Sequence, residues 1–263
     1  MPSTILLSPE TAPLRTLTLA RLQLDQEAPV CAVQTNGEEI CLYVLIGEIE
    51  VADVSYDDVV GGSYGRFGGR RTITEPGVAV LRLPAGRPST FQVQLCDFSA
   101  DLLIVSTPGP ATDAGVVMHH DDIWAHHVGE GTHRREVREV PTPAHFQISC
   151  GETLQQAGMI SSWPPHANAE DLAKFAAGVT TWEEAFFVVA PSSGFAVLDG
   201  YYADRTPVHE IIRLENGRSY AMPLGSHACH AAPDSYLYYC WAYCGNALQK
   251  QYRKYADDVG VYR

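Results

Sequence analysis

The sequence has no apolar stretch of the roughly 18 residues that a membrane-spanning helix requires. Its start has no basic segment followed by an apolar core, which a secretory signal needs. From these absences we expect no membrane partner and a cytoplasmic protein. Basic runs are missing as well, and the formal net charge of −13 argues against a nucleic-acid partner.

Cysteines in metal-binding spacing are also missing. The seven cysteines contain no Cys-x-x-Cys pair and no zinc-ribbon spacing. We therefore interpret them as reduced thiols buried on strands, rather than as a metal site or a disulfide framework. They are Cys31, Cys41, Cys96, Cys150, Cys229, Cys240 and Cys244.

What the chain does have is typical of short strands and turns. It contains 22 Gly and 17 Pro, and Val, Tyr and Thr are frequent. Residues 39–53 predict a strand, a turn at Gly47 and a second strand, because Ile49 and Val51 alternate with polar residues. Residues 236–245 predict the last core strand. We therefore predict an all-β fold.

A weak internal repeat indicates how these strands are organised. Residues 77–86 and 217–225 both run from a Gly through an alternating strand to Pro-x-Gly. This similarity predicts two copies of one β-barrel unit. A Pro/Gly/Ala-rich break at 107–113 is the expected linker, which divides the chain into barrels at 1–115 and 116–263.

The two copies differ where ligands would be expected. The first has Arg87-Pro88 where the second has Ser226-His227, and its earlier strands contain no His. We therefore expect an N-terminal barrel without metal ligands and a C-terminal barrel with them.

Two other patterns are interpreted as connections. The Gly-rich residues 61–71 predict a hairpin tip rather than a phosphate-binding loop, because no helix start follows them. A histidine cluster lies in 118–135, where neighbouring side chains point to opposite faces and no Cys or Glu pattern completes a site. An exposed connecting segment is favoured over a metal site there. The cluster comprises His119, His120, His126, His127 and His133.

The strongest functional signal is a set of metal-ligand residue types in order along the C-terminal half. Pro-Pro-His166-Ala-Asn168 is followed by Glu184 at the opening of an apolar strand, and then by Pro-Leu-Gly-Ser-His227. Together these residues supply two imidazoles, an amide and a carboxylate at strand ends. A β-barrel assembles a metal site from residues placed in this way.

This order resembles the two sequence motifs of the cupin superfamily. It is more closely similar to the bicupin family of 5-deoxy-glucuronate isomerase and 5-keto-4-deoxyuronate isomerase. The similarity is good over residues 120–246 and faint over 35–107. It rests on Ser162-Trp-Pro-Pro-His166, Glu183-Glu184-Ala-Phe-Phe, Gly194-Phe195-Ala, Pro223-x-Gly225-x-His227, Ala231-Ala-Pro with Tyr236-Leu-Tyr-Tyr, and Gly129-Glu-Gly131 with Arg135. The resemblance implies two tandem cupin-type (jelly-roll) β-barrels.

The resemblance also implies a divalent metal ion, Zn, Mn or Fe, on His166, Glu184 and His227. The second His of the family's His-x-His falls on Asn168, whose amide oxygen is neutral and a weaker donor. Three arrangements stay open. Asn168 completes a site for a harder metal such as Mn, or water replaces it, or the site binds metal poorly. His209 and His230 are alternative donors.

The activity that the resemblance implies is aldose–ketose isomerisation of a sugar acid or a related polyol by a homodimer, in carbohydrate metabolism such as inositol catabolism. Such chemistry needs a proton shuttle and an arginine fork for the substrate carboxylate. Candidates for the shuttle are Glu183, His209, Tyr202, Tyr236 and Tyr238, and candidates for carboxylate binding are Arg135, Arg205 and Arg213.

One departure from the family points to other functions. After Gly194-Phe195-Ala the family tends to have a polar, often basic pair, whereas this chain has Val197-Leu198-Asp199-Gly200. An Asp there would suit a neutral or cationic substrate. The alternatives are another metal-dependent cupin enzyme, such as a dioxygenase or a biosynthetic tailoring enzyme, and a non-catalytic bicupin that binds a small molecule. Metal binding separates enzyme from binder, and oxygen uptake separates oxygenase from isomerase.

Overall fold

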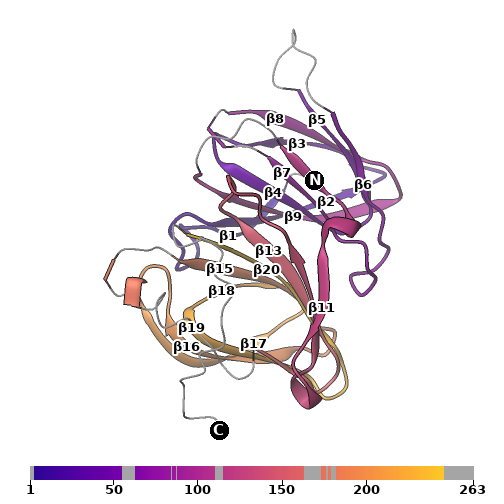
Figure 1. Ribbon diagram of the computed structural model, residues 1–263. Coiled ribbons are helices and arrows are strands. Elements are labelled where there is room, and N and C mark those ends of the chain that lie inside the picture. Colours follow the sequence, from indigo (N-terminus) through magenta and orange to yellow (C-terminus); the bar gives the residue numbers. More distant parts are fainter. Residues whose placement is uncertain are drawn as a thin grey trace. The chain divides into compact units, whose positions relative to one another are not determined.

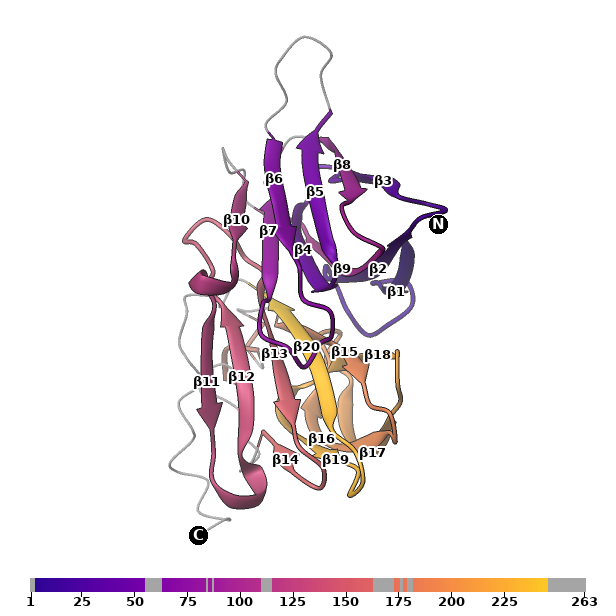
Figure 2. The same ribbon diagram turned by 90° about the vertical axis from the view of Figure 1, so that its right-hand side faces the viewer.

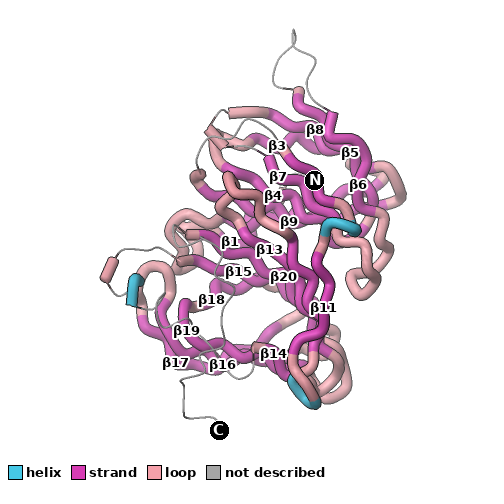
Figure 3. Tube along the Cα trace, in the orientation of Figure 1, coloured by secondary structure: helices cyan, strands magenta, loops and turns pink. Residues whose placement is uncertain are grey.

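The computed structural model describes residues 3–54, 63–83, 85–86, 88–109, 115–162, 173–175, 177–178 and 182–245. Strands and turns make up nearly all of this part (Figure 3), and helical turns are confined to η1 (His120–Asp122), η2 (Gly131–His133) and residues 173–175. The all-β prediction is therefore confirmed. No helix in these ranges has the length and hydropathy that a membrane span needs.

The chain folds into two compact units. Unit 1 comprises Met1–Leu6, Thr18–Trp124 and Val140–Ser149, and unit 2 comprises Leu7–Leu17, Ala125–Glu139 and Cys150–Arg263. The sequence predicted a single cut between residues 115 and 116, which stays a prediction. The division by spatial contacts differs from that cut, because each unit contains segments from both sides of residue 115.

Unit 1 is a sandwich of two antiparallel sheets (Figure 1), with strand orders β1-β2-β9-β4-β7-β10 and β3-β8-β5-β6. The turn between β4 and β5 requires glycine, because Gly47 has φ 85° and a Cβ there would lie 2.2 Å from the Ser99 carbonyl oxygen. The predicted strand–turn–strand is thus confirmed. The strands are β1 (Thr4–Leu7), β2 (Thr18–Asp25), β3 (Val30–Gln34), β4 (Glu39–Ile46), β5 (Glu48–Asp53), β6 (Ser63–Gly68), β7 (Ala79–Leu83), β8 (Thr90–Leu95), β9 (Ser99–Thr107) and β10 (Val116–Met118).

Unit 2 is also a sandwich of a six-stranded and a four-stranded sheet (Figure 2), with orders β11-β12-β13-β20-β15-β18 and β14-β19-β16-β17. Its core lies between the sheets and includes Phe186, Leu198 and Tyr239. The strands are β11 (Trp124–Val128), β12 (Arg135–Val140), β13 (Ser149–Gln155), β14 (Ile160–Ser161), β15 (Glu183–Val189), β16 (Gly194–Tyr201), β17 (Pro207–Leu214), β18 (Ser219–Met222), β19 (Leu224–Ala231) and β20 (Leu237–Cys244).

The two units share a topology, as the internal repeat predicted. The order β2-β9-β4-β7 in unit 1 matches β13-β20-β15-β18 in unit 2, and β3-β8-β5-β6 matches β14-β19-β16-β17. Individual positions can be matched through the residue that precedes each Pro-x-Gly. Leu83 pairs with Ile40 in unit 1, and Met222 pairs with Glu184 in unit 2. Ile40 is therefore the counterpart of Glu184.

All seven cysteines are reduced. Five of them are buried, as the sequence predicted. Cys31 and Cys96 are partly exposed, which corrects the prediction for these two, and Cys96 follows the end of β8 rather than lying on a strand. Cys31 lies on the same face of β3 as buried Val33 and packs against the edge of the unit 1 core.

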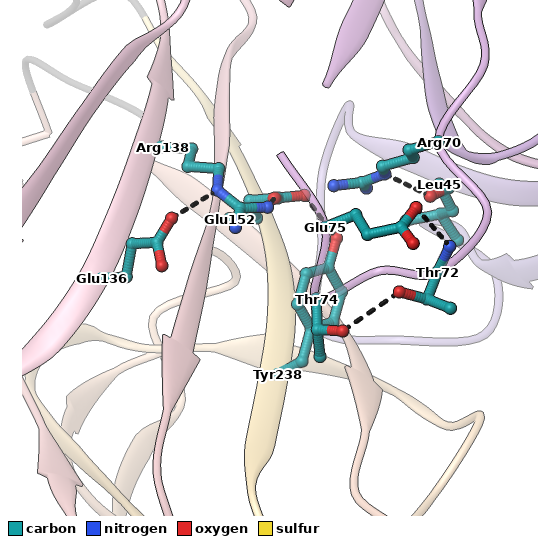
Figure 4. Close-up of polar contacts among 9 residues, drawn as sticks. All are labelled: Leu45, Arg70, Thr72, Thr74, Glu75, Glu136, Arg138, Glu152 and Tyr238. Carbon is teal, nitrogen blue, oxygen red and sulfur yellow. Dashed lines mark hydrogen bonds and ion pairs between the residues drawn. The ribbon is translucent and has the colours of Figure 1, made fainter. Parts of the chain in front are cut away.

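A buried ionic network lies on strands β12, β13 and β20 of unit 2 (Figure 4). Arg138 Nη1 donates to Glu152 at 2.5 Å and its Nε donates to Glu136 at 2.7 Å. The Tyr238 hydroxyl donates to the second oxygen of Glu152 at 2.7 Å. The side chains of Arg138 and Glu152 are only 4% and 2% exposed, so each charge depends on its partners rather than on water.

We expect Arg138→Met to destabilise unit 2 by about 3 kcal/mol, because Glu152 would keep a buried charge without its cation. A urea unfolding titration measures the loss. The matched control is Arg66→Met, which breaks an ion pair with Glu48 whose arginine side chain is 58% exposed. Equal stability of the two variants would contradict a structural role for the network.

Candidate metal centre

Glu184 and His227 meet inside unit 2, as the sequence predicted for two members of one site. Strand alternation places Glu184 on the core face of β15 with Phe186, and His227 on the core face of β19 with Cys229. Glu184 Oε2 and His227 Nε2 are 3.8 Å apart. Both residues are only 3% exposed. The two sheets of the sandwich therefore contribute one donor each.

An aromatic stack holds the imidazole. The Phe186 ring packs edge-on against His227, with centroids 5.4 Å apart, and stacks on Tyr239 at 4.5 Å. Because a ring packed on one side has few alternative rotamers, His227 is held in a fixed orientation.

The donor chemistry fits a divalent metal. A buried carboxylate oxygen and an imidazole nitrogen are ligands that Zn, Mn and Fe all accept. The other predicted ligands, His166 and Asn168, lie outside the described residues. Within the described ranges, no group of three or more His, Cys, Asp or Glu side chains could hold a metal. Among the described residues, the structure therefore brings two of the four predicted ligands together, and the metal site stays a prediction.

Unit 1 shows that the fold itself does not need this pair. Its counterpart of Glu184 is Ile40, which is 2% exposed and belongs to the apolar core. On β8, the counterpart of β19, the core-facing residues are Phe91, Val93 and Leu95. Burying polar groups costs stability unless they are paired, so their presence in unit 2 alone indicates a function.

Glu183 serves a different purpose from its neighbour. Its carboxylate accepts backbone N–H bonds from Arg15, Thr16 and Leu17 at 2.9–3.0 Å, and a hydroxyl bond from Thr16 at 3.1 Å. Four donors on one carboxylate fix the N-terminal segment of unit 2. The sequence proposed Glu183 as a proton shuttle, and this geometry describes an anchor.

The counterpart of Glu183 in unit 1 does the same. Glu39 is the first residue of β4, and its two oxygens accept the N–H groups of Gln147 and Ile148 at 2.7 and 3.0 Å. Burial raises the pKa of Glu39, and the two amide bonds oppose that rise. A carboxylate anchor at this position is therefore a repeated feature of the fold.

Two of the tyrosine candidates have carboxylate partners. Tyr238 donates to Glu152 in the network on the other face of β20, away from Tyr239. Tyr202 donates to Glu210 at 3.1 Å. Burial, followed by the hydrogen bond to Glu210, raises the pKa of Tyr202 to about 12. Tyr202 therefore keeps its proton at neutral pH.

The two remaining shuttle candidates lie elsewhere. His209 is on the outer face of β17, where its side chain is 75% exposed and its Nδ1 is 2.6 Å from Asp199. Tyr236 precedes β20 at the end remote from Glu184, since Glu184 pairs with Tyr243. Seven residues of strand, or about 23 Å, separate Tyr236 from that pairing position.

Asp199 lies on the outer face of its sheet. Its side chain is 63% exposed and forms an ion pair on the outer face of the sheet, while its neighbour Leu198 faces the core. The expectation that this residue favours a neutral or cationic substrate stays a prediction, and the outward position of Asp199 gives it no support. Period-two alternation turns Asp199 away from the barrel interior.

All three arginine candidates belong to unit 2, and Arg135 is the buried one. It is 8% exposed, donates to the His133 carbonyl oxygen at 3.2 Å, and its charge opposes the burial that raises the pKa of Tyr239 to about 12. Arg213 is on the surface, with its side chain 72% exposed. Arg205 stacks over Phe175 at 4.8 Å.

The histidine cluster forms no metal site among the described residues. Its residues lie mostly exposed along η1, β11 and η2. His126 Nε2 is 3.9 Å from Glu139, whose pKa is raised by burial and lowered in part by this imidazole. The segment contains an edge strand as well as connections, which the sequence did not predict.

Sequence reasoning missed Tyr239. It is 3% exposed, and its hydroxyl donates to Ser161 Oγ at 2.8 Å on the core side of β20. The run Leu-Tyr-Tyr-Cys-Trp offered two adjacent tyrosines, and the sequence analysis named Tyr238. In a strand buried on both faces, hydrophobicity does not tell which of two neighbours points inward.

The KduI/IolB family model matches residues 3–259 of the chain. An IolB-like protein from Salmonella typhimurium LT2 has a similar structure, with a TM-score of 0.72 and 20% identity over 95% of this chain and 89% of that one. Oxalate decarboxylase from Lactobacillus farciminis matches with a TM-score of 0.60 and 11% identity, covering 92% and 82% of the two chains. No curated protein matches the sequence.

A third similar structure is AerE from Microcystis aeruginosa, with a TM-score of 0.52 and 12% identity over 87% of this chain and 88% of that one. At these identities the likeness shows the fold alone. It confirms the predicted pair of cupin-type β-sandwich barrels.

We expect Glu183→Ala to lower the free energy of unfolding by about 2 kcal/mol, because buried backbone N–H groups of the N-terminal segment would lose their acceptor. Metal affinity per folded molecule should not change, since the anchor points away from Glu184. Chemical denaturation and metal titration measure the two quantities, and Glu39→Ala is the matched control in unit 1. A fully stable Glu183→Ala variant that loses only activity would restore the shuttle hypothesis.

Proposed function

The chain belongs to the KduI/IolB family, and on that premise we propose that it is a metal-dependent isomerase that interconverts the aldose and ketose forms of a sugar acid of the 5-deoxy-glucuronate type. Members of this family are isomerases, which supports an enzyme role acting on a small sugar-derived molecule. The observation that carries the proposal is the buried Glu184–His227 pair. In unit 1, the core residue Ile40 is the counterpart of Glu184, and Pro88 stands in the sequence where unit 2 has His227.

In this proposal Glu184 and His227 hold the metal together with His166, and Asn168 is the fourth donor. Held by these residues, a divalent ion, Zn, Mn or Fe, would supply Lewis-acid polarisation of the substrate carbonyl and stabilisation of negative charge on the adjacent oxygen. The remaining work falls to side chains of the chain itself. They must bind the acid, orient it and move one proton between neighbouring carbons.

We assign proton transfer to Tyr202, with Glu210 as its partner. The register places Glu210 opposite Leu198 and Leu198 opposite His227, so the three side chains form one row on the same face of the sheet. Tyr202 donates to Glu210. A phenol with a pKa of about 12 serves as an acid that returns a proton, and the carboxylate serves as its acceptor.

We assign the substrate carboxylate to Arg135. Its guanidinium is largely buried, and among the described residues it has no carboxylate within ion-pair distance. A buried cation without a counter-charge is unfavourable, so an anionic ligand would stabilise it. This assignment is also consistent with the net charge of −13. The overall negative field repels an acidic substrate, so a local cation must bind its carboxylate.

The proposal includes a homodimer in the cytoplasm, without nucleic-acid or membrane partners. Support for self-association comes from β17, an edge strand among the described residues, on which Ile211 is 70% exposed.

Metal binding provides the first test. Titration of the metal-free protein with Zn²⁺ or Mn²⁺ should give one site, and Glu184→Gln or His227→Asn should weaken it by about a hundredfold or more, because each removes a direct ligand. His126→Asn is the matched control, since His126 contacts Glu139 at a similar distance of 3.9 Å. No saturable metal binding, or equal losses in control and test variants, would contradict the metal site.

A second substitution tests the unusual ligand. If Asn168 is a donor, Asn168→His should raise the affinity for Zn²⁺ relative to Mn²⁺, because imidazole is the better zinc ligand. Competition titrations with the two ions measure the ratio. An unchanged ratio would show that water, rather than Asn168, occupies that position.

The reaction itself can be followed with 5-deoxy-glucuronate. The metal-loaded protein should convert it to the ketose without consuming oxygen. The Tyr202→Phe variant should have a lower kcat and a nearly unchanged KM, because the phenol acts in the transition state rather than in substrate binding. Oxygen uptake in place of isomerisation would favour the dioxygenase alternative. Ligand binding without any turnover would favour a non-catalytic bicupin.

A further inference from the structure

The turn between β3 and β4 of unit 1 holds an asparagine and a glycine in the left-handed region of the backbone. Asn36 has φ 50° and Gly37 has φ 82°. The Glu38 N–H donates to the Thr35 carbonyl oxygen at 2.7 Å and closes the turn. Positive φ at both central residues characterises a type I′ turn, for which Asn-Gly is a preferred pair. The geometry of the turn therefore accounts for this dipeptide.

Asn-Gly is also the pair in which an asparagine side chain reacts most readily with the backbone, because glycine has no side chain to hinder the approach. In this reaction the backbone nitrogen of the glycine forms a bond to the asparagine Cγ. The bond from Cγ to the side-chain nitrogen breaks, and ammonia leaves with the proton of the backbone N–H. Water then opens the resulting succinimide ring at either carbonyl. The product is aspartate, or isoaspartate, in which the main chain runs through the side-chain carbon.

The structure leaves both reacting groups of the first pair accessible. Asn36 is exposed, and among the described residues its side chain makes no hydrogen bond. The Gly37 N–H donates to the Thr35 hydroxyl at 3.5 Å, which is at the outer limit for a hydrogen bond. An N–H held this weakly is released by small local movements of the turn. Attack of the Gly37 nitrogen on the Asn36 side chain therefore meets little resistance.

A second Asn-Gly pair, Asn216-Gly217, lies between β17 and β18 of unit 2 and provides a comparison within the same molecule. Asn216 is exposed as well, but both of its reacting groups are held. The Gly217 N–H donates to the Val188 carbonyl oxygen at 2.8 Å, and Asn216 Oδ1 accepts the Ala190 N–H at 3.2 Å. Cyclisation here requires the loss of two hydrogen bonds, which protects this pair.

We propose that Asn36 is a site of spontaneous covalent modification in the folded protein, through cyclisation onto the Gly37 nitrogen and ring opening by water, and that Asn216 is protected. The isoaspartate product weakens unit 1. The inference is independent of the proposed catalytic function, because neither the reaction nor its consequence involves a metal or a substrate.

The two products differ in their effect on the turn. Aspartate at position 36 suits a type I′ turn as asparagine does. Isoaspartate lengthens the main chain by one carbon inside a four-residue turn, which displaces the contacts on either side. Gly37 accepts the Gly86 N–H at 2.9 Å through its carbonyl oxygen, and two residues later Glu39 anchors the backbone of 147–148. Unit 1 therefore loses stability only through the isoaspartate form.

Peptide mapping of the aged full chain by mass spectrometry tests the inference, with isoaspartyl methyltransferase labelling to identify isoaspartate. We expect residue 36 to convert about tenfold faster than residue 216 in the folded protein, because a firm hydrogen bond on the attacking nitrogen slows its release by roughly that factor. Equal rates at the two positions would overturn the inference.

Ageing the same protein in concentrated urea separates the effect of structure from that of sequence. The unfolded chain holds neither N–H in a fixed hydrogen bond, so the two rates should agree within about twofold. A preference for residue 36 that persists unchanged in urea would show that sequence neighbours cause it, and would overturn the structural argument. Conversion of both residues in urea, with none at residue 36 in the folded protein, would also overturn it.

The consequence for unit 1 is tested with Asn36→Gly as the matched control, because Gly-Gly also fits a type I′ turn and has no side chain to cyclise. Urea unfolding compares each aged protein with its own fresh sample. Aged wild type should lose stability in proportion to its isoaspartate content, with faster amide exchange in β4 and unchanged exchange in β15. Fresh Asn36→Asp should match fresh wild type. An equal loss in aged Asn36→Gly, or no loss in aged wild type, would contradict the proposed effect on unit 1.

Discussion

Burial of a carboxylate against an imidazole inside an apolar barrel is the constraint on which the rest of unit 2 depends. Glu184 and His227 come from opposite sheets, so the sandwich must close correctly before they meet at 3.8 Å. Phe186 packs edge-on against the imidazole and stacks on Tyr239, so one aromatic cluster joins His227 to the core side of β20. The candidate chemistry therefore depends on core packing rather than on surface loops alone.

A comparison of the two units separates residues that the fold requires from residues that are available for function. Both units have the same strand order and both place an anchoring glutamate at the start of the same strand, Glu39 in one and Glu183 in the other. What the units share is required by the fold, and what only one possesses is available for function. By this comparison Glu183 belongs to the scaffold, whereas Glu184 belongs to the candidate site.

The two-barrel architecture and two of the candidate ligands could be predicted from the sequence. The Pro-x-Gly repeat indicated two β-barrels, and the order of motifs singled out Glu184 and His227, because such spacing is set by strand and turn lengths. Side-chain direction could not be predicted equally well. Where a strand is buried on both faces, as at Tyr238 and Tyr239, hydrophobicity is the same for inward and outward residues. The partners of Asp199 and Glu183 could not be predicted for a related reason, since they come from the neighbouring strand or from distant parts of the sequence.

The most direct test of this account is the anomalous scattering of crystals saturated with Mn²⁺ or Zn²⁺. The account predicts one strong peak in unit 2, about 2.0–2.2 Å from both a Glu184 carboxylate oxygen and His227 Nε2. A saturated crystal with no peak between these two side chains, or with the metal bound only elsewhere, would contradict the central claim.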